Sequence, residues 1–196
     1  MAELWAIILA GGESKRMKSP KMLLPFRGKT IIERVIENVI TSKVHNTMVV
    51  LGAEYEAILK VISGLQVKHC YNENYKNGML SSVKCGFRSL PDDFEAALFF
   101  QGDQPMIAPL VVNEVIDAYR NSSKGIVIPV FSTKRGHPLL LDRKYRSEVE
   151  KLNNEESLRS IAEKFPGDVL EVEVKAPEIL RDIDTHEDYL NEINQT

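Results

Sequence analysis

Residues 4–21, LWAIILAGGESKRMKSPK, contain the change of pattern that decides the fold. Leu4 to Ala10 is an unbroken apolar run, which is typical of a strand buried on both faces of a parallel sheet. Gly11 and Gly12 follow at once, and glycines permit a sharp turn and a close approach of backbone N–H groups to a ligand. A buried strand that runs into a glycine loop therefore predicts an α/β fold with a binding site at the carboxyl end of the strand.

The rest of the chain continues this alternation of short apolar runs and apolar stripes at helical spacing. The expected strands are residues 4–10, 47–51, 66–71, 96–101, 125–130, 138–141 and 169–174. The expected helices are residues 30–42, 54–62, 81–90, 109–120, 143–152 and 156–164, and one that begins near Thr185 with a capping-box pattern. Strands that alternate with helices of this length predict crossover connections, and hence a mostly parallel sheet with helices on both faces.

The composition is that of a single globular domain spanning residues 1–196, without a linker, a repeat or a low-complexity segment. There are 25 Lys and Arg against 28 Asp and Glu, a net charge of -3, which excludes the basic balance of a general nucleic-acid binder. Two cysteines, Cys70 and Cys85, are too few for a disulfide framework, so we expect a cytoplasmic protein in which they are inert packing residues. The apolar run of residues 4–10 is too short to cross a bilayer, and we expect no membrane partner.

Four cations follow the two glycines within seven residues: Lys15, Arg16, Lys18 and Lys21. Backbone amides of a glycine turn, combined with cations, suit the phosphates of a nucleoside triphosphate. The alternative is a simple turn at the end of a strand with solvated charges, which the glycines alone would favour. The cation cluster favours phosphate binding. The loop is neither a Walker A motif nor the spaced dinucleotide fingerprint.

The same loop resembles the signature L-A-[GA]-G-x-S-x-R-M-G-x-x-K of the molybdenum cofactor nucleotidyltransferases, which include cytidylyltransferases and molybdopterin-guanine dinucleotide synthases. The matching positions are Leu9, Ala10, Gly11, Gly12, Ser14, Arg16, Met17 and Lys21. Lys18 departs from it, since the family usually has glycine there. The following segment, MLLPFRGKTIIERVIENV, is also similar to the family. The resemblance implies a Rossmann-like nucleotidyltransferase fold, a MobA-like NTP transferase domain over residues 1–196.

Asp103 lies in the tetrapeptide GDQP, directly after the expected strand 96–101. A carboxylate at this edge of a sheet suits Mg²⁺, which prefers hard oxygen ligands. The alternative is an Asx turn or a cap of the helix at residues 109–120. GDQP resembles the magnesium-binding tetrapeptide of the cytidylyltransferase branch, and this resemblance favours the metal.

A second acidic stretch, Asp182-Ile183-Asp184-Thr185, resembles the family's D-[IV]-D-T-P-E-D segment, whose second acid completes the metal site. Asp184 is the matching position, and Asp182 is the weaker candidate. His186 replaces the usual proline. The alternative is that Thr185 caps a helix with solvated acids around it.

Two further stretches have weaker similarity to the family. Asn72, Gly78, Ser82 and Gly86 match a loop that touches the base and ribose, although an ordinary loop with Ser81 as a helix N-cap is equally compatible. Residues 135–138, RGHP, resemble a stretch near the acceptor, although a lone histidine such as His137 is more often structural. The histidines lack zinc-ligand spacing, and no GxSxG elbow supports a serine hydrolase.

The resemblance implies transfer of a nucleoside monophosphate, CMP from CTP, to the terminal phosphate of molybdopterin cofactor, with release of pyrophosphate. The expected catalytic residues are Arg16, Lys21 and Asp103, and Mg²⁺ is expected on Asp103 and Asp184. The expected nucleotide-binding residues are Leu9, Ala10, Gly11, Gly12, Arg16, Lys21, Asn72, Gly78 and Ser82. The expected partners are CTP or GTP, a molybdopterin-type phosphate acceptor, and in transient contact a recipient molybdoenzyme or its chaperone.

Three alternatives stay open. Guanylyl transfer is favoured by Gly11, because glycine at this position is typical of guanosine users, whereas GDQP and DIDT are similar to the cytidylyl branch. A sugar-phosphate or methylerythritol-phosphate nucleotidyltransferase would keep the chemistry and change the acceptor. A non-catalytic nucleotide-binding or cofactor-delivery protein would keep the glycine loop and lose the metal acids.

Overall fold

The computed structural model describes residues 3–17 and 19–194, so Lys18 of the predicted cation cluster lies outside the described residues. The strands are β1 (Leu4–Ala10), β2 (Pro25–Phe26), β3 (Lys29–Thr30), β4 (Asn46–Leu51), β5 (Lys68–Tyr71), β6 (Ala96–Gln101), β7 (Ile126–Phe131), β8 (Lys134–Arg135), β9 (Leu139–Asp142) and β10 (Val169–Glu173). The helices are α1 (Ile31–Ile40), α2 (Tyr55–Ile62), α3 (Met79–Arg88), α4 (Pro109–Arg120), α5 (Arg146–Lys151), α6 (Leu158–Lys164) and α7 (His186–Asn194). Short 3₁₀ turns cover residues 21–23, 75–77, 143–145, 166–168 and 177–180.

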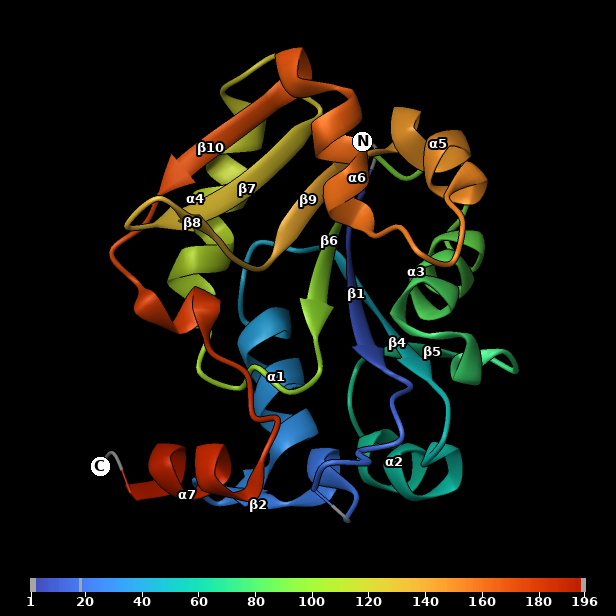
Figure 1. The fold of residues 1–196 in the computed structure, drawn as a ribbon, viewed down its shortest axis with the longest axis vertical. Coiled ribbons are helices and arrows are strands. Elements are labelled where there is room, and N and C mark those ends of the chain that lie inside the picture. Colours follow the sequence, from blue (N-terminus) through green and yellow to red (C-terminus); the bar gives the residue numbers. More distant parts are fainter. Residues whose placement is uncertain (1–2, 18, 195–196) are drawn as a thin grey trace.

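The main sheet has the strand order β10-β7-β9-β6-β1-β4-β5, and β8 pairs with β7. Strand β1 lies parallel to β4 and β6, with Ile8 opposite Val49 and Phe100. Only β9 in this order runs against its neighbours β6 and β7. The other strands therefore end at one edge of the sheet, which lies at the lower side of Figure 1 where the arrowheads of β1, β4 and β6 point. The predicted mostly parallel α/β sheet is confirmed.

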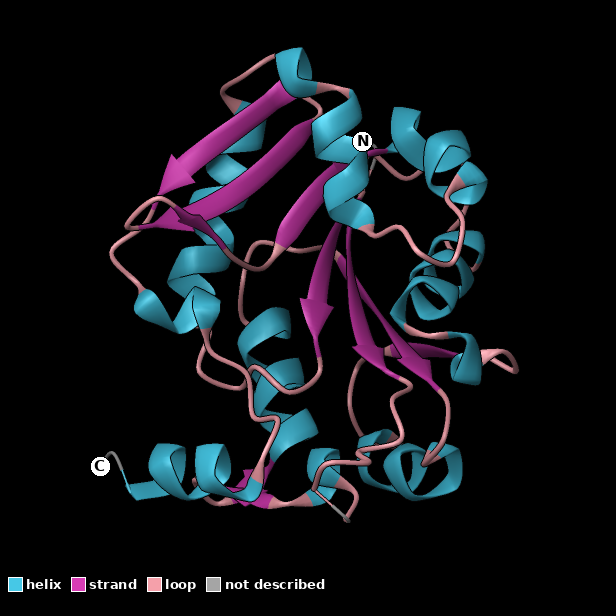
Figure 2. Cartoon of the chain, in the orientation of Figure 1, coloured by secondary structure: helices cyan, strands magenta, loops and turns pink. Residues whose placement is uncertain are grey.

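Helices lie on both sides of the sheet (Figure 2), and an apolar cluster covers each of its faces. Alternate side chains of a strand point to opposite faces, and β1 shows this clearly. Ile8 packs in the cluster that includes residues of α1, α2 and α4, whereas Ile7 packs in the cluster that includes residues of α3, α5 and α6. Because both faces are covered, β1 reads as a continuous apolar run in the sequence.

Capping side chains fix the start of two helices, and the sequence analysis predicts the one at Thr185. The Thr30 hydroxyl accepts from the amide of Glu33, whose carboxylate in turn accepts from Thr30, so that α1 begins with a complete capping box. The same exchange joins Thr185 and Asp188 at the start of α7. The described helices include none that is both long and apolar enough to cross a membrane.

Two local features differ from the expectation. Helix α3 begins at Met79, and its N-cap is Gly78 with a φ of 89°, so the interpretation of Ser81 as N-cap is wrong. The small hairpin β2–β3 was not predicted, and its turn residues Arg27 and Gly28 both have positive φ. Cys70 and Cys85 pack against the cluster that includes α3, and their Sγ atoms lie 3.6 Å apart.

Candidate active site

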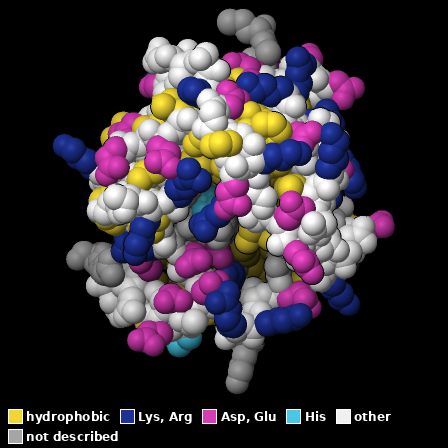
Figure 3. Space-filling view, turned by 45° about the horizontal axis from the view of Figure 1, so that its top comes forward, with side chains coloured by type: hydrophobic (Ala, Val, Ile, Leu, Met, Phe, Trp, Pro, Cys, Tyr) yellow, Lys and Arg dark blue, Asp and Glu magenta, His cyan; other side chains and the backbone are white. Residues whose placement is uncertain are grey.

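A cavity of about 540 Å³ opens at the carboxyl edge of the sheet, and Figure 3 shows the hollow with acidic and basic side chains around it. Its wall is built from the loop after β1, the start of α3, the end of β6 and the segment before α7. Seven of the nine predicted nucleotide-binding residues line it: Leu9, Gly11, Gly12, Arg16, Lys21, Gly78 and Ser82. The predicted acids Asp103 and Asp184, and the weaker candidate Asp182, line it as well.

The other predicted contacts lie behind the wall of this cavity. Ala10 is completely buried, and Asn72 is only 4% exposed. The Asn72 amide donates to the hydroxyls of Ser81 (2.8 Å) and Ser82 (3.0 Å), so it positions the lining residue Ser82. Gly86 packs α3 against β1, since a Cβ there would meet the Ile7 side chain at 2.7 Å. Ala10, Asn72 and Gly86 are therefore not among the residues that line the cavity, and their packing and hydrogen bonds support its wall.

The glycine loop is held tightly on one side and is open on the other. A Cβ on Gly11 would lie 3.0 Å from the Ser82 hydroxyl, whereas a Cβ on Gly12 would have no neighbour within 4 Å. The Gly11 carbonyl accepts from the amide of Ala53 (3.2 Å), and a Cβ on Gly52 would meet that carbonyl at 2.4 Å. Gly52 is thus required by a close backbone approach that the sequence analysis missed.

A turn at Ser14 carries the two predicted catalytic cations. Ser14 has a positive φ of 51°, its carbonyl accepts from the amide of Met17 (3.0 Å), and its hydroxyl accepts from the amide of Lys21 (3.2 Å). Met17 is buried in a small cluster with Phe26 and other apolar side chains. The matched serine and methionine of the signature therefore shape the loop, and the cations reach the cavity from it.

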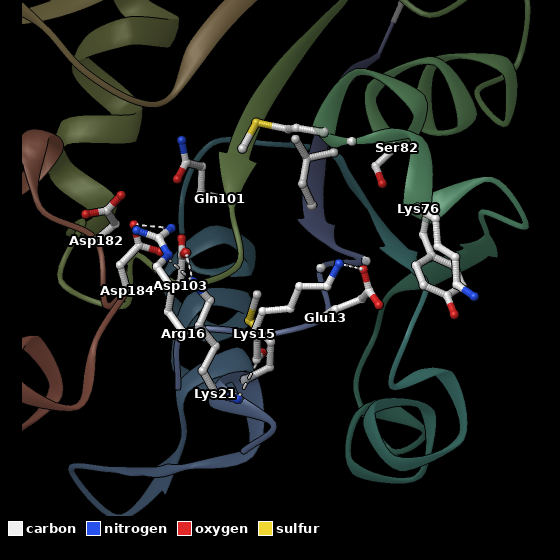
Figure 4. Close-up of a pocket in the computed structure, with 18 residues that line it drawn as sticks. Glu13, Lys15, Arg16, Lys21, Lys76, Ser82, Gln101, Asp103, Asp182 and Asp184 are labelled. Atoms are coloured by element: carbon white, nitrogen blue, oxygen red, sulfur yellow. Dashed lines mark hydrogen bonds and ion pairs between the residues drawn. The ribbon is translucent and has the colours of Figure 1, made fainter. Parts of the chain in front are cut away.

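The two acids that the sequence could only pair by resemblance meet in the structure. The Ile183 amide donates to the Asp103 carbonyl (3.1 Å), which brings the acids on both sides of Ile183 to the GDQP loop. Lys21 Nζ lies 2.5 Å from Asp103 Oδ2 and 3.0 Å from Asp184 Oδ1. Arg16 Nη2 lies 2.7 Å from Asp184 Oδ2. Figure 4 shows the acids gathered on one side of the cavity, with Ser82 and Lys76 on the opposite side.

The structural alternatives for Asp103 are wrong. The N-cap of α4 is Ala108, so Asp103 does not cap that helix. In an Asx turn the Asp side chain accepts from the backbone N–H two residues later in the chain. For Asp103 that residue is Pro105, which has no N–H. Asp103 Oδ2 is taken by Lys21, and its Oδ1 is buried without a hydrogen-bond partner.

Electrostatics keep Lys21 charged. Burial of the ammonium would lower the pKa of Lys21, but the negative charges and hydrogen bonds of Asp103 and Asp184 outweigh it and raise the pKa above the ordinary value. For Asp182, burial together with the neighbouring charges of Asp184 and Asp103 raises the pKa. Asp182 therefore holds its proton more readily than an ordinary aspartate.

The donor set fits a hard divalent cation. The unpartnered buried oxygen of Asp103 and the carboxylate of Asp184 are the type of ligand that Mg²⁺ takes together with substrate phosphates and water. Within residues 3–17 and 19–194, no group of three or more His, Cys, Asp or Glu side chains is arranged to hold a metal ion. An ion on Asp103 and Asp184 would thus need ligands from a bound substrate.

A second cavity of about 360 Å³ adjoins the first, and Leu9, Met79 and Gln101 line both. Its other walls include the apolar side chains of Leu80, Val83, Phe99, Ile128 and Leu139. Its polar lining includes Arg135 of β8, His137 of the loop before β9, and Arg159 of α6.

Gln101 and His137 are joined at the boundary of the two cavities. Gln101 Nε2 lies 2.9 Å from His137 Nε2, so the amide donates to an unprotonated ring nitrogen. Burial, reinforced by the positive charge of Arg159, lowers the pKa of His137 to about 4. Sequence reasoning missed Gln101, and its only signal is its place as the last residue of β6. It also missed Tyr75 and Lys76, although they lie inside the loop that resembles the family.

Comparison with known proteins gives a consistent set of relatives. The family model of the MobA-like NTP transferase domain matches residues 6–169. The chain is 28% identical over 192 residues to the molybdenum cofactor cytidylyltransferase of Escherichia coli (strain K12), covering 97% of this chain and 95% of that protein. It is 30% identical over 127 residues to a probable molybdenum cofactor guanylyltransferase of Natranaerobius thermophilus, covering 65% of this chain and 60% of that protein. Among solved structures, the manganese complex of Rv0371C from Mycobacterium tuberculosis H37Rv superposes with a TM-score of 0.79 at 20% identity and full coverage of both chains.

Proposed function

The chain belongs to the family of MobA-like NTP transferase domains, and we propose that this nucleotidyltransferase transfers CMP from CTP to the terminal phosphate of a molybdopterin-type cofactor and releases pyrophosphate. The observation that carries the proposal is the pair of adjoining cavities at the carboxyl edge of the sheet. The first is lined by glycine amides, cations and acids, which suit a triphosphate. The second has apolar walls, which suit a ring system.

The proposed reaction needs no covalent intermediate with the protein. An oxygen of the acceptor phosphate attacks the α-phosphorus of the nucleotide, and the bond from that phosphorus to the oxygen bridging to the β-phosphate breaks, so that pyrophosphate leaves with its electron pair. Catalysis of this kind consists of positioning and electrostatic stabilisation. Arg16, Lys21, Gly11 and Gly12 line the first cavity, where the two side chains would supply positive charge and the glycine backbone would supply N–H donors to the phosphates.

A divalent ion completes the proposed site. Asp103 and Asp184 would hold it, and when bound it would neutralise phosphate charge. The manganese complex of the structural neighbour supports a divalent ion in proteins of this fold, and Mg²⁺ is the ion that we propose for this chain. Asp182 lines the same cavity, but its raised pKa makes it the weaker ligand.

The second cavity bears on the choice of acceptor. A sugar phosphate or methylerythritol phosphate presents hydroxyl groups, which the apolar walls formed by Leu80, Val83 and Phe99 cannot pair, so these groups would depend on the polar part of the lining alone. A flat pterin with a phosphate matches the apolar walls with the guanidinium of Arg159 near the rim, and within the described residues Arg159 makes no ion pair. The acceptor that the geometry favours is therefore the cofactor.

Guanylyl transfer is the second candidate. Gly11 leaves more room beside Ser82 than an alanine would, and one relative is named as a probable guanylyltransferase. Against it stand the GDQP and DIDT segments and the longer match to the cytidylyltransferase. Because a single methyl group in a pocket discriminates by only about 1–3 kcal/mol, we expect CTP to be used best and GTP to be used measurably.

One assay tests the function. The purified protein with Mg²⁺ is incubated with each of the four nucleoside triphosphates, crossed with molybdopterin cofactor, a sugar phosphate and methylerythritol phosphate, and pyrophosphate release is measured. We expect the highest specificity constant for CTP with the cofactor. Faster turnover with the sugar phosphate or with methylerythritol phosphate would reject molybdopterin cofactor as the acceptor. Tight nucleotide binding without turnover on any acceptor would identify a binding or delivery protein instead.

A further inference from the structure

The two proposed metal ligands already hold cations that belong to the protein. The Lys21 ammonium bridges Asp103 and Asp184, and its side chain is only 12% exposed. Arg16 occupies the remaining oxygen of the Asp184 carboxylate. Of the four carboxylate oxygens, only Oδ1 of Asp103 is buried without a partner.

The formal charges of this cluster cancel, because two carboxylates face one ammonium and one guanidinium. A divalent ion added among these groups would bring two more positive charges to within a few ångströms of Lys21. Charges of like sign at such distances in a partly buried site repel strongly. A metal ion therefore has to displace Lys21 from the acids.

The phosphates of a bound nucleotide would attract Lys21 and Arg16 and so compensate for the loss of their ion pairs with the acids. The glycine loop and the acids face the same cavity, so the phosphates of a nucleotide there lie within reach of both side chains. Arg16 is free to follow them, since its side chain is 68% exposed. Lys21 is anchored through its backbone amide on Ser14, which leaves its flexible stem to swing from the carboxylates toward the cavity.

We propose that Lys21 and Arg16 are the resident cations of the metal site, which keep a divalent ion off Asp103 and Asp184 until a nucleotide draws both side chains onto its phosphates. This inference rests on the proposed nucleotide site. Metal and nucleotide then bind cooperatively, and by linkage each strengthens the other by the same factor. The exchange also leaves the phosphates in contact with all three cations at the moment when the acids receive the metal.

Calorimetric titration of Mn²⁺ tests the exchange without any turnover. The protein is titrated alone and after saturation with the non-transferable α,β-methylene analogue of CTP or GTP, and the affinity of the analogue itself for Mn²⁺ is measured in buffer. For the wild type we expect Mn²⁺ to bind at least tenfold more weakly without the analogue, after that correction. For Lys21→Met we expect the nucleotide-free protein to bind Mn²⁺ at least tenfold more tightly than the wild type does.

Two further variants make the result specific. Lys43→Met removes a lysine from an exposed ion pair with Asp117, away from the cavity, and is expected to leave Mn²⁺ affinity unchanged. Arg16→Gln removes the exposed cation alone, and we expect a smaller gain of about threefold, so it carries the test if Lys21→Met does not fold. Equal Mn²⁺ affinity in the wild type and in both cavity variants overturns the exchange, as does a wild type that never binds Mn²⁺. Failure of the acceptor assay with cooperative Mn²⁺ binding intact would reject the proposed function and leave this inference standing.

Discussion

The backbone amide of Ile183 donates to the carbonyl of Asp103 across a distance of 3.1 Å. This bond ties the segment before α7 to the loop after β6, which are about 80 residues apart in the chain. Ile183 itself is completely buried in the cluster with Met17, Phe26 and Ile31. Packing of Ile183 in this apolar cluster therefore helps to fix the positions of the neighbouring acids.

Ile183→Ala should weaken this packing. Removing a buried isoleucine typically costs about 2–5 kcal/mol, and the loosened segment carries Asp184. We expect a loss of about 3 kcal/mol in the free energy of unfolding, measured by urea denaturation, and a lower affinity for nucleotide with metal. Leu190→Ala in α7, where the side chain is 41% exposed, is the matched control and should change the free energy by less than about 1 kcal/mol. A variant as stable as the wild type would show that the cluster does not hold the acids.

Asp103→Asn should abolish most turnover and leave the fold intact. The substitution keeps the size of the side chain but removes the charge that the proposed metal and Lys21 both need. We expect the rate at saturating substrates to fall by a hundredfold or more, about 3 kcal/mol in the transition state. Circular dichroism should match the wild type. Asp93→Asn, at an exposed position, is the control, and activity of Asp103→Asn near that of the control would exclude Asp103 from the site.

Gly11→Ala should change the preference between bases. The new methyl would lie 3.0 Å from the Ser82 hydroxyl, which has to turn away and narrow the space beside the loop. We expect the ratio of specificity constants for CTP over GTP to rise by about tenfold, in line with about 1–3 kcal/mol for one methyl group. Gly12→Ala points into open space, so its ratio should stay as in the wild type. A ratio that falls for Gly11→Ala would reverse the base assignment.

His137 should make the protein less stable in mild acid. Burial lowers its pKa in the folded chain to about 4, whereas the unfolded chain has the ordinary value of about 6.5. Between these values the unfolded chain binds the extra proton, so stability falls as the pH falls through this window. From pH 7 to pH 5 this amounts to about 1–2 kcal/mol. His137→Gln should lose this part of the pH dependence in urea denaturation, whereas His69→Gln, at an exposed position, should keep it.

The buried elements were predictable because their patterns are local. Strands β1 and β6 and helix α4 have the same bounds in the structure as in the prediction, since each is an uninterrupted apolar run or a stripe at helical spacing. The capping interaction between Thr185 and Asp188 spans only three residues, so the sequence pattern predicted it as well. Ser81 was misjudged because Gly78, with its positive φ, begins α3 earlier than the serine does.

The candidate site was predictable only in part, because its contacts join distant segments. The meeting of Asp103 with Asp184 depends on the path of the chain after β10, which no periodicity encodes. Gly52 is required by the backbone of Gly11, and Gln101 is held by His137 from the loop before β9. Residues that are required by a distant contact carry no local pattern in a single sequence. The resemblance to a family identified only the residues that lie within its signature.

The position of Asp184 has a consequence for shortened chains. A chain that ends after β10 keeps every strand of the main sheet and most residues of both apolar layers. It still lacks Asp184, Ile183 and α7, so Lys21 has only one of its two carboxylate partners. The Tyr189 hydroxyl donates to the Pro25 carbonyl, so α7 at the end of the chain lies against the hairpin β2–β3 near its beginning. A chain shortened in this way would therefore keep the strands of the sheet and lack the second acid of the site.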